Sequence, residues 1–241
     1  MSAPPPHLSV VIPAFNEASR LPAYLDEVIG FLEGRGEPYE VIVVDDGSTD
    51  GTAAAVLALA ARQPAARLLP LGRNRGKGAA VRAGMLAATG VRRLFTDADG
   101  ATPIAELKRL EPALAAGHDL VIGSRVLHDP AVAVHARWHR VATGRVFNWL
   151  VARTGLRGVA DSQCGFKLFT AGAAEALFAA LETTGFAFDV ELLLRAQAAG
   201  YRIAEVPVNW ADQKGSKVGV FRSGPGMLLQ LLQARRRAGR R

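Results

Sequence analysis

Two aspartates separated by one residue follow a short stretch that is expected to form a strand. Residues 92–96 have the composition of a strand, and Asp97-Ala98-Asp99 comes directly after them. Two carboxylates at positions i and i+2 on a turning backbone can converge on a hard divalent cation, and such cations are usually held by one or two carboxylates together with substrate phosphates. Asp97 and Asp99 are therefore candidate ligands for Mg²⁺ or Mn²⁺, although the pattern by itself is common.

A second acidic loop follows a short apolar run. Residues 41–44 lead into Asp45-Asp46-Gly47-Ser48-Thr49-Asp50. Carboxylates here can accept hydrogen bonds from ribose hydroxyls or a base N–H, so Asp45 and Asp46 are assigned to a ligand. Ser48 and Asp50 are assigned to the turn and to capping the next helix. Neither this loop nor residues 13–17 carries the glycines of a dinucleotide fingerprint or a P-loop, which disfavours those nucleotide-binding folds.

The elements that would position these loops alternate along the chain. Continuous apolar runs, typical of strands buried on both faces, occur at 8–13 and 41–44, and further strands are expected at 68–71 and 92–96. Helices are expected over 21–32, 52–62 and 78–88. This alternation predicts an α/β fold with a mainly parallel central sheet and helices on both faces. In such sheets ligands bind beyond the carboxyl ends of the strands, where the polar loops 13–17, 45–50, 74–78 and 97–102 follow.

Composition limits the class of protein. With 241 residues, 49% hydrophobic and 21% charged, and without an evident linker, the chain is expected to form one domain over residues 1–241, with its core at 8–210. The single Cys164 excludes an internal disulfide and a multi-cysteine metal cluster, and a small buried residue is expected there. Residues 1–7 resemble neither a signal peptide nor an anchor, so a cytoplasmic location is expected.

Two segments carry patterns that suit a membrane surface, and the net charge of +7 indicates an anionic partner. Within 134–153, Trp138 and Trp149 lie three helical turns apart with arginines nearby. Within 225–241, an apolar run leads into a polybasic end. We expect an interfacial helix and an amphipathic basic tail. A helix packed on the sheet and a disordered, solubilising tail are the alternatives.

Four motifs, taken in order, resemble glycosyltransferase family 2 with its GT-A fold. They are Val10-Val11-Ile12-Pro13-Ala14-Phe15-Asn16-Glu17, the loop from Asp45 to Thr52, Asn74-Arg75-Gly76-Lys77-Gly78, and Asp97-Ala98-Asp99-Gly100-Ala101-Thr102. Within that family, a second set resembles the dolichyl-phosphate β-glucosyltransferases, with the dolichyl-phosphate mannosyltransferases as near relatives. This set is Gly123-Ser124-Arg125, the segment from Asp161 to Phe169, Phe188-Asp189-Val190-Glu191, Asn209-Trp210 and Gly215-Ser216-Lys217.

The resemblance implies an inverting transfer of a hexose from a nucleoside-diphosphate sugar, UDP-glucose in the glucosyl branch, to a polyprenyl phosphate at the inner face of the cell membrane. It implies that Pro13, Phe15, Glu17 and Asp46 line the base and ribose with Asp45 beside them, and that Lys77 and Ala98 belong to the donor site. Asp97 and Asp99 would flank the diphosphate, Asp99 being the stronger metal candidate, and Arg125 and Lys217 would meet phosphate oxygens.

Two departures from the family pattern bear on the substrate and the membrane. Mannosyl relatives often carry Gln two residues after the second aspartate, where this chain has Ala101, which favours the glucosyl branch. Eukaryotic glucosyl enzymes carry an N-terminal anchor that this sequence does not show. Attachment is then expected through residues 134–153, the basic tail, a membrane-protein partner or a homo-oligomer.

The expected mechanism depends on the acceptor. A phosphate monoester is largely dianionic at neutral pH and needs no general base, so cations matter more, and the candidates are the metal, Arg125, Lys167 and Lys217. If the acceptor is an alcohol, Asp189 or Glu191 becomes the candidate base. Both can equally be charges at a helix N-terminus.

Three other functions fit parts of the pattern. They are mannosyl transfer from GDP-mannose, chain extension of a surface polysaccharide, and a non-catalytic module that binds nucleotide sugar or nucleic acid. The chain shows no aromatic and basic RNA-reading motif, so a nucleic-acid partner is not expected.

Replacing both Trp138 and Trp149 by alanine should weaken binding to anionic liposomes, because interfacial tryptophans hold an amphipathic helix at the headgroup level. Co-sedimentation with liposomes measures the effect. Unchanged sedimentation of the double variant would remove this segment as the membrane contact.

Overall fold

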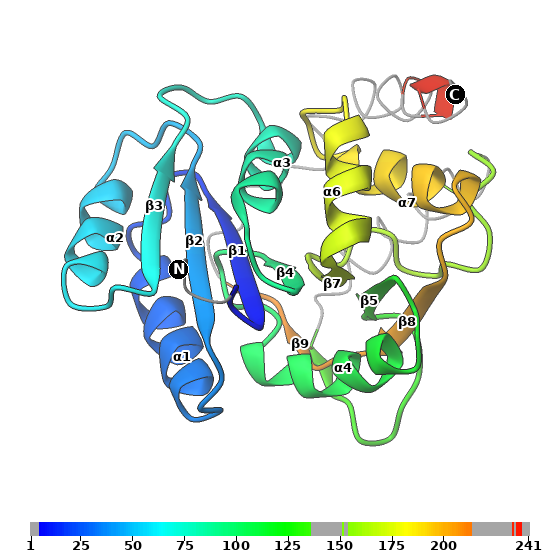
Figure 1. The fold of residues 1–241 in the computed structure, drawn as a ribbon, viewed down its shortest axis with the longest axis horizontal. Helices are drawn as coiled ribbons and strands as arrows, with labels where there is room; N and C mark the ends of the chain where they lie inside the picture. Colours follow the sequence, from blue (N-terminus) through cyan, green and yellow to red (C-terminus); the bar gives the residue numbers. More distant parts are fainter. Residues whose placement is uncertain (1–4, 136–150, 152–153, 214–232, 234, 238–241) are drawn as a thin grey trace.

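The computed structural model describes residues 5–135, 151, 154–213, 233 and 235–237 (Figure 1). Its centre is a seven-stranded sheet with the strand order β3-β2-β1-β4-β7-β5-β8. The strands are β1 (Leu8–Ala14), β2 (Tyr39–Asp45), β3 (Ala66–Pro70), β4 (Arg92–Thr96), β5 (Leu120–Ser124), β7 (Phe166–Thr170) and β8 (Ile203–Pro207). The four strands expected from the sequence, at 8–13, 41–44, 68–71 and 92–96, are all present.

The sheet is mixed, with a single strand running against the others. β1 pairs in parallel with β2 and β4, β2 with β3, and β5 with β8. β7 is antiparallel to both of its neighbours, β4 and β5. The prediction of a mainly parallel sheet is confirmed. The antiparallel β7 brings its own preceding loop to the edge where the parallel strands end.

Helices cover both faces of the sheet, as predicted. One face packs on α1 (Leu21–Glu33), α2 (Thr52–Ala60), the 3₁₀ turn η1 (Ile104–Glu106) and α4 (Leu107–Ala115). The other face packs on α3 (Lys77–Ala87), α6 (Ala171–Ala180) and α7 (Phe188–Ala198). Figure 1 shows α1 and α2 beside the β3-β2-β1 half, and α4, α6 and α7 beside the other half.

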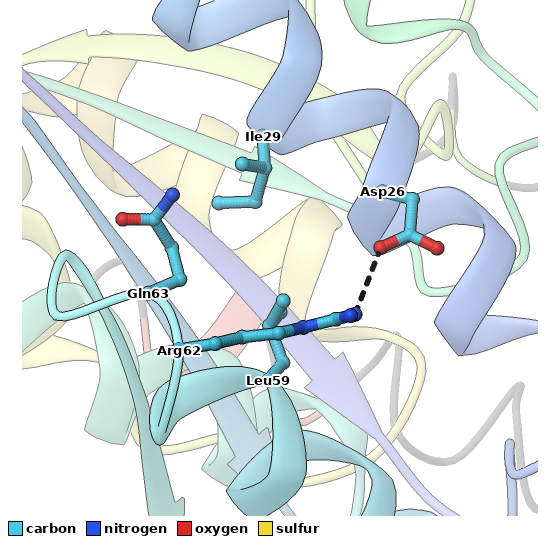
Figure 2. Close-up of a pocket in the computed structure, with 5 residues that line it drawn as sticks. All are labelled: Asp26, Ile29, Leu59, Arg62 and Gln63. Carbon is cyan, nitrogen blue, oxygen red and sulfur yellow. Dashed lines mark hydrogen bonds and ion pairs between the residues drawn. The ribbon is translucent and has the colours of Figure 1, made fainter.

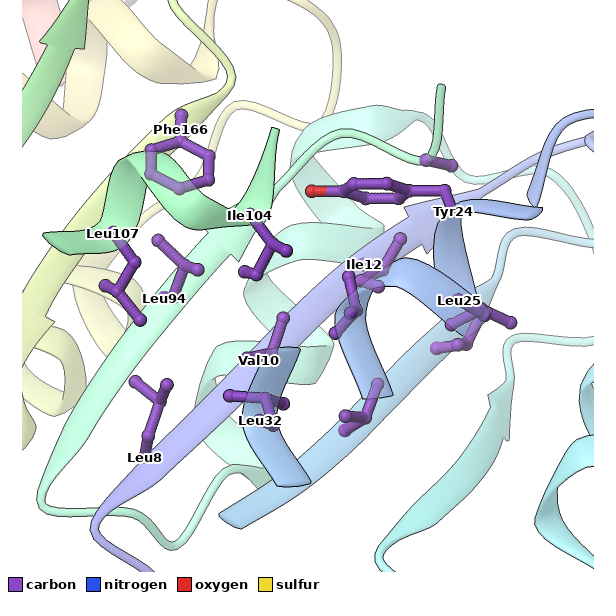
Figure 3. Close-up of a cluster of buried hydrophobic side chains, with 14 of the residues drawn as sticks. Leu8, Val10, Ile12, Tyr24, Leu25, Leu32, Leu94, Ile104, Leu107 and Phe166 are labelled. Carbon is purple, nitrogen blue, oxygen red and sulfur yellow. The ribbon is translucent and has the colours of Figure 1, made fainter. Parts of the chain in front are cut away.

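The strand sequences divide their side chains between these two faces. In β1, Val10 and Ile12 lie in the core cluster on the α1 face, whereas Val11 lies in the cluster on the α3 face. All three are fully buried, and burial of one such side chain contributes roughly 1.5–3 kcal/mol. Figure 3 shows Val10 and Ile12 together with Leu25 and Leu32 of α1 in one buried cluster. Continuous apolar runs are therefore required, because every position of a central strand faces a core.

A two-stranded ribbon lies beside the main sheet. β6 (Val134–His135) pairs in parallel with β9 (Trp210–Ala211), and the Ala211 N–H donates to the Ala101 carbonyl at 2.9 Å. The segment 134–153, expected to be an interfacial helix, thus begins as a strand. Trp138 and Trp149, like Lys217, lie outside the described residues. None of the helices in the described ranges has the length and apolarity needed to cross a membrane.

Replacing Gly84 by alanine should destabilise the protein by about 1–3 kcal/mol through overpacking. A Cβ at Gly84 on α3 would lie 2.4 Å from Cγ1 of Val11 and 2.7 Å from Cγ2 of Val44, so the α3 backbone rests directly on β1 and β2. Gly172 on α6 has nothing within 4 Å of its Cβ position, so Gly172→Ala is the control and should not destabilise. Urea unfolding of both variants measures the difference, and equal midpoints would contradict the packing.

Candidate functional site

The loops singled out by the sequence meet at one edge of the sheet. The carboxyl ends of β1 and β2 are joined by a hydrogen bond from the Asp46 N–H to the Ala14 carbonyl, at 2.9 Å. The Asp97 N–H, just beyond β4, donates to the Gly165 carbonyl before β7, at 3.0 Å. The expectation that the loops gather at the carboxyl edge is confirmed, and the loop 161–165 joins them because β7 runs in the opposite direction.

Asp97 and Asp99 lie at this edge with partly exposed side chains, 35% for Asp97 and 24% for Asp99. Nζ of Lys77 lies 2.7 Å from Oδ1 of Asp97. Lys77 opens α3 and follows Gly76, whose φ of 98° requires a glycine. The Asp97 carboxylate also lies against Gly165, where an added Cβ would stand 2.0 Å from Oδ2. The Asp97 carboxylate is therefore held between the Lys77 ammonium and the backbone of Gly165.

Asp99 is paired with Arg20, which the sequence analysis did not identify. Nη1 of Arg20 lies 3.7 Å from Oδ2 of Asp99, while its Nε and Nη2 bind Glu17 at 2.7 Å and 2.6 Å. Burial and the nearby charge of Asp97 raise the pKa of Asp99, opposed by its bond from the Ala101 N–H and by Arg20. The two carboxylates thus repel each other and depend on neighbouring cations.

Asp45 and Asp46 are buried, at 6% and 3% exposure, and both make bonds within the protein. Asp45 accepts from the Ser48 N–H at 3.0 Å, and Asp46 accepts from the backbone N–H groups of Arg75 and Gly76 at 2.7 Å and 2.9 Å. Asp46 therefore fixes the turn that precedes Lys77. The neighbouring Gly47, with φ of 75°, lies so close that a Cβ would be 2.5 Å from the Arg73 carbonyl carbon.

The remaining predicted donor residues sit differently with respect to solvent. Phe15 is 37% exposed, whereas Pro13 is buried in β1 opposite Val44. Ala98 belongs to the hydrophobic core, so position 98 can offer only its backbone to a ligand. Ser48 and Asp50 have the structural roles assigned to them. Ser48 Oγ accepts from the Asn16 N–H at 2.8 Å, and Asp50 accepts from the Thr52 N–H at 2.9 Å.

Arg125, directly after β5, forms a forked ion pair with Asp161. Its Nε and Nη2 bind the two carboxylate oxygens at 2.7 Å and 2.8 Å, and its guanidinium lies 5.6 Å from the Trp210 ring centroid. Although burial opposes it, the Asp161 carboxylate holds the pKa of Arg125 above its usual value. The Arg125 side chain is 31% exposed, so part of it reaches solvent at the edge, while its ion pair with Asp161 holds it in place.

Asp189 and Glu191 lie in the first turn of α7, as expected, but both are buried, at 2% and 0% exposure. Asp189 Oδ1 is 2.5 Å from Nζ of Lys167, itself fully buried. Burial raises the pKa of Asp189, and the Lys167 charge opposes that shift. The structure thus places the Lys167 ammonium in the core, bonded to Asp189 and the Cys164 carbonyl, instead of at the edge where a phosphate could reach it.

Cys164 is fully buried, as predicted, and burial raises the pKa of its thiol to about 12. Within the described ranges no three His, Cys, Asp or Glu side chains are grouped to hold a metal ion. The pair Asp97 and Asp99 nevertheless fits Mg²⁺ or Mn²⁺ by its chemistry, because these ions take one or two carboxylates and complete their shells with water and phosphate. Lys77 and Arg20 already balance these carboxylates, so the site is built for positive charge.

A depression lies between the middle of α1 and the end of α2. Its volume is about 260 Å³, and it is lined by Asp26, Ile29, Leu59, Arg62 and Gln63 (Figure 2). Asp26 and Arg62 form an exposed ion pair of 3.4 Å across it. It contains none of the residues predicted for binding or catalysis.

A family model, "Glycosyl transferase family 2", matches residues 9–178. The dolichyl-phosphate beta-glucosyltransferase of Drosophila melanogaster is 43% identical over 233 residues, covering 91% of this chain and 71% of its own length. The human dolichyl-phosphate beta-glucosyltransferase is 39% identical over 251 residues, covering 98% and 76%.

Solved structures of glucosyl-3-phosphoglycerate synthase from Mycobacterium tuberculosis share the fold. The complex with Mn²⁺, UDP and glucosyl-3-phosphoglycerate has a TM-score of 0.70 and 22% identity, covering 95% of this chain and 80% of that one. This similarity confirms the GT-A architecture.

Replacing Gly165 by alanine should weaken Mn²⁺ binding in the presence of UDP by about 10-fold to 100-fold, because a Cβ would displace the Asp97 carboxylate. Calorimetric titration measures the affinity, with Gly172→Ala as the control whose Cβ meets nothing within 4 Å. If Gly165→Ala is folded and binds Mn²⁺ like the unchanged protein, Asp97 is not held in place by this contact.

Proposed function

The chain belongs to glycosyltransferase family 2, and on that premise we propose that it transfers glucose from UDP-glucose to a polyprenyl phosphate of the dolichyl phosphate type. Relatives about 40% identical over nine tenths of the chain, in fly, human and yeast among others, are dolichyl-phosphate beta-glucosyltransferases. The observation that carries the acceptor assignment is that both candidate bases, Asp189 and Glu191, are buried and ion-paired.

On the donor side, the edge loops supply groups suited to a nucleoside diphosphate. Phe15 offers an exposed ring to the base. Glu17, in the loop after β1, and Asp45 and Asp46, at the end of β2, would line the base and ribose. Lys77, with Nζ at the Asp97 carboxylate, stands where a diphosphate oxygen would be bound. A divalent cation held by Asp97 and Asp99 would supply charge that stabilises the leaving diphosphate.

On the acceptor side, a phosphate brings its own negative charge and needs no protein base. Its oxygen forms a bond to the anomeric carbon while the bond from that carbon to the diphosphate oxygen breaks, with the electron pair leaving on UDP. No proton has to move, and attack from the opposite face inverts the configuration. The work of the chain is then to hold two anions together, for which Arg125 at the edge is suited, with Lys217 proposed from the sequence motif.

A polyprenyl phosphate is embedded in a membrane, so the proposal also implies work at a membrane surface, at its cytoplasmic face. The basic end of the chain supports this, since anionic headgroups attract such a segment at roughly 1 kcal/mol per basic residue. The Trp138 to Trp149 segment stays a sequence prediction.

The test is to incubate the purified protein with Mn²⁺, dolichyl phosphate and either UDP-glucose or GDP-mannose, and to look for an acid-labile glycolipid. UDP-glucose with dolichyl phosphate should be the productive pair. Product from GDP-mannose would replace glucose by mannose in the proposal. Nucleotide binding without any transfer would indicate a non-catalytic module.

Replacing Asp99 by alanine should lower the transfer rate by about 100-fold or more, because the cation loses one of its two carboxylates. The fold should persist, since Asp99 is partly exposed and accepts a single backbone bond within the described ranges, from the Ala101 N–H at 3.1 Å. Asp26→Ala on the exposed side of α1 is the matched control and should retain full activity. Transfer at the normal rate by a folded Asp99→Ala enzyme would exclude the metal role.

A further inference from the structure

We infer that Glu191 is a positioning residue that holds the loop 182–185 as a seat for Lys77, an inference that rests on the proposed function. Glu191 lies in the first turn of α7 and is fully buried. Its carboxylate is nonetheless the centre of a bonded network that ends at the donor site.

The Glu191 carboxylate binds the loop through two successive backbone groups. It accepts from the Glu182 N–H at 3.0 Å and from the Thr183 N–H at 2.9 Å, and it also accepts from the Thr183 hydroxyl. Nε of Arg195, one turn further along α7, lies 2.8 Å away and balances the charge. A buried carboxylate with this many donors is fixed in place, and removing it would leave buried N–H groups without an acceptor.

The loop held in this way binds the start of α3. The Thr184 carbonyl accepts from the N–H of Gly78 at 2.8 Å and from that of Ala79 at 3.3 Å. The first N–H groups of a helix have no partner within the helix. No side chain of the N-cap residue Gly76 caps α3, so the Thr184 carbonyl accepts these N–H groups instead. The loop therefore determines where α3 begins.

Two glycines let the loop and the helix come into direct backbone contact. A Cβ at Gly76 would lie 2.5 Å from the Thr184 carbonyl oxygen. A Cβ at Gly78 would lie 2.5 Å from the Thr183 carbonyl oxygen and 2.7 Å from Cβ of Phe188. Lys77 stands between these two contacts, so its backbone cannot shift unless the loop shifts with it.

The position of this loop also affects the ion pair between Lys77 and Asp97 at the edge of the sheet. Nζ of Lys77 lies 2.7 Å from Asp97, and it also faces the rings of Phe95 and Phe186 at 5.4 Å and 5.9 Å. Phe186 directly follows the seat, so the loop supplies part of the surroundings of the ammonium. Loss of the Glu191 carboxylate should therefore misplace Lys77 without touching it.

A double-mutant cycle between positions 191 and 77 tests this, with the UDP dissociation constant in Mn²⁺ as the readout. Lys77→Gln should raise that constant about tenfold, and Glu191→Gln should raise it several-fold. The double variant should bind UDP like Lys77→Gln alone, because Glu191 acts only through Lys77. Normal UDP affinity in a folded Glu191→Gln protein, or losses that multiply in the double variant, would overturn the inference.

Glu106→Gln is the matched control. Glu106 is also a buried carboxylate that accepts a backbone N–H, from Asn209 at 3.0 Å, and pairs with an arginine on its own helix turn, Arg109. Its effect and that of Lys77→Gln should multiply. If Glu191→Gln does not fold, Gly78→Ala tests the same seat from the helix side and should show the same lack of additivity with Lys77→Gln.

The readout separates this inference from the proposed function. UDP binding with the expected cycle but no glucosyl transfer would refute the acceptor assignment and leave the role of Glu191 intact. Glucosyl transfer by a Glu191→Gln enzyme with normal UDP affinity would do the reverse. A protein that does not bind UDP at all would overturn both.

Discussion

Two carboxylates close together at the end of β4 are the constraint around which this site is organised. Asp97 and Asp99 repel each other, and burial together with the nearby charge of Asp97 raises the pKa of Asp99. Lys77 forms an ion pair with Asp97 and Arg20 forms one with Asp99, and the two cations come from different loops at the same edge. The proposed ligands, a metal ion together with a diphosphate, would bring the same two kinds of charge to this edge.

Ion pairs also hold side chains in place at the edge, in the case of Arg125, and in the core behind it, in the case of Lys167 and Glu191. Arg125 is bound to Asp161, Lys167 to Asp189 and Arg195 to Glu191. Breaking such a buried pair strands a charge, so each partner is restricted to one geometry. Asp189 and Glu191, the two candidate bases, therefore form ion pairs that stabilise the interior. Chemistry is left to the partly exposed groups at the rim, and a nucleophile that is already ionised suits that division.

Much of the fold could be read from the sequence, because central strands buried on both faces leave continuous apolar runs such as residues 41–44. The acidic pair was placed correctly because it directly follows the short strand expected at residues 92–96. β7 was not predicted. Its second residue is Lys167, whose buried charge is balanced by Asp189, 22 positions later, and no local sequence pattern indicates that pairing. Arg125 and Asp161 are likewise 36 positions apart. Arg20 could have been found, because its spacing of three from Glu17 is typical of paired side chains.

Four glycines around the edge, Gly47, Gly76, Gly78 and Gly165, leave no room for a side chain, since an added carbon would meet backbone or the Asp97 carboxylate within 2.5 Å. At Gly47, Gly76 and Gly78 the backbone of one loop therefore packs directly against the backbone of another, and at Gly165 it packs against the Asp97 carboxylate. Saturation libraries at these positions would return almost nothing but glycine. Diversification toward other nucleotide sugars, in the laboratory or over evolutionary time, has to proceed through exposed side chains such as Phe15 and Phe186, above a contour that is closed to change.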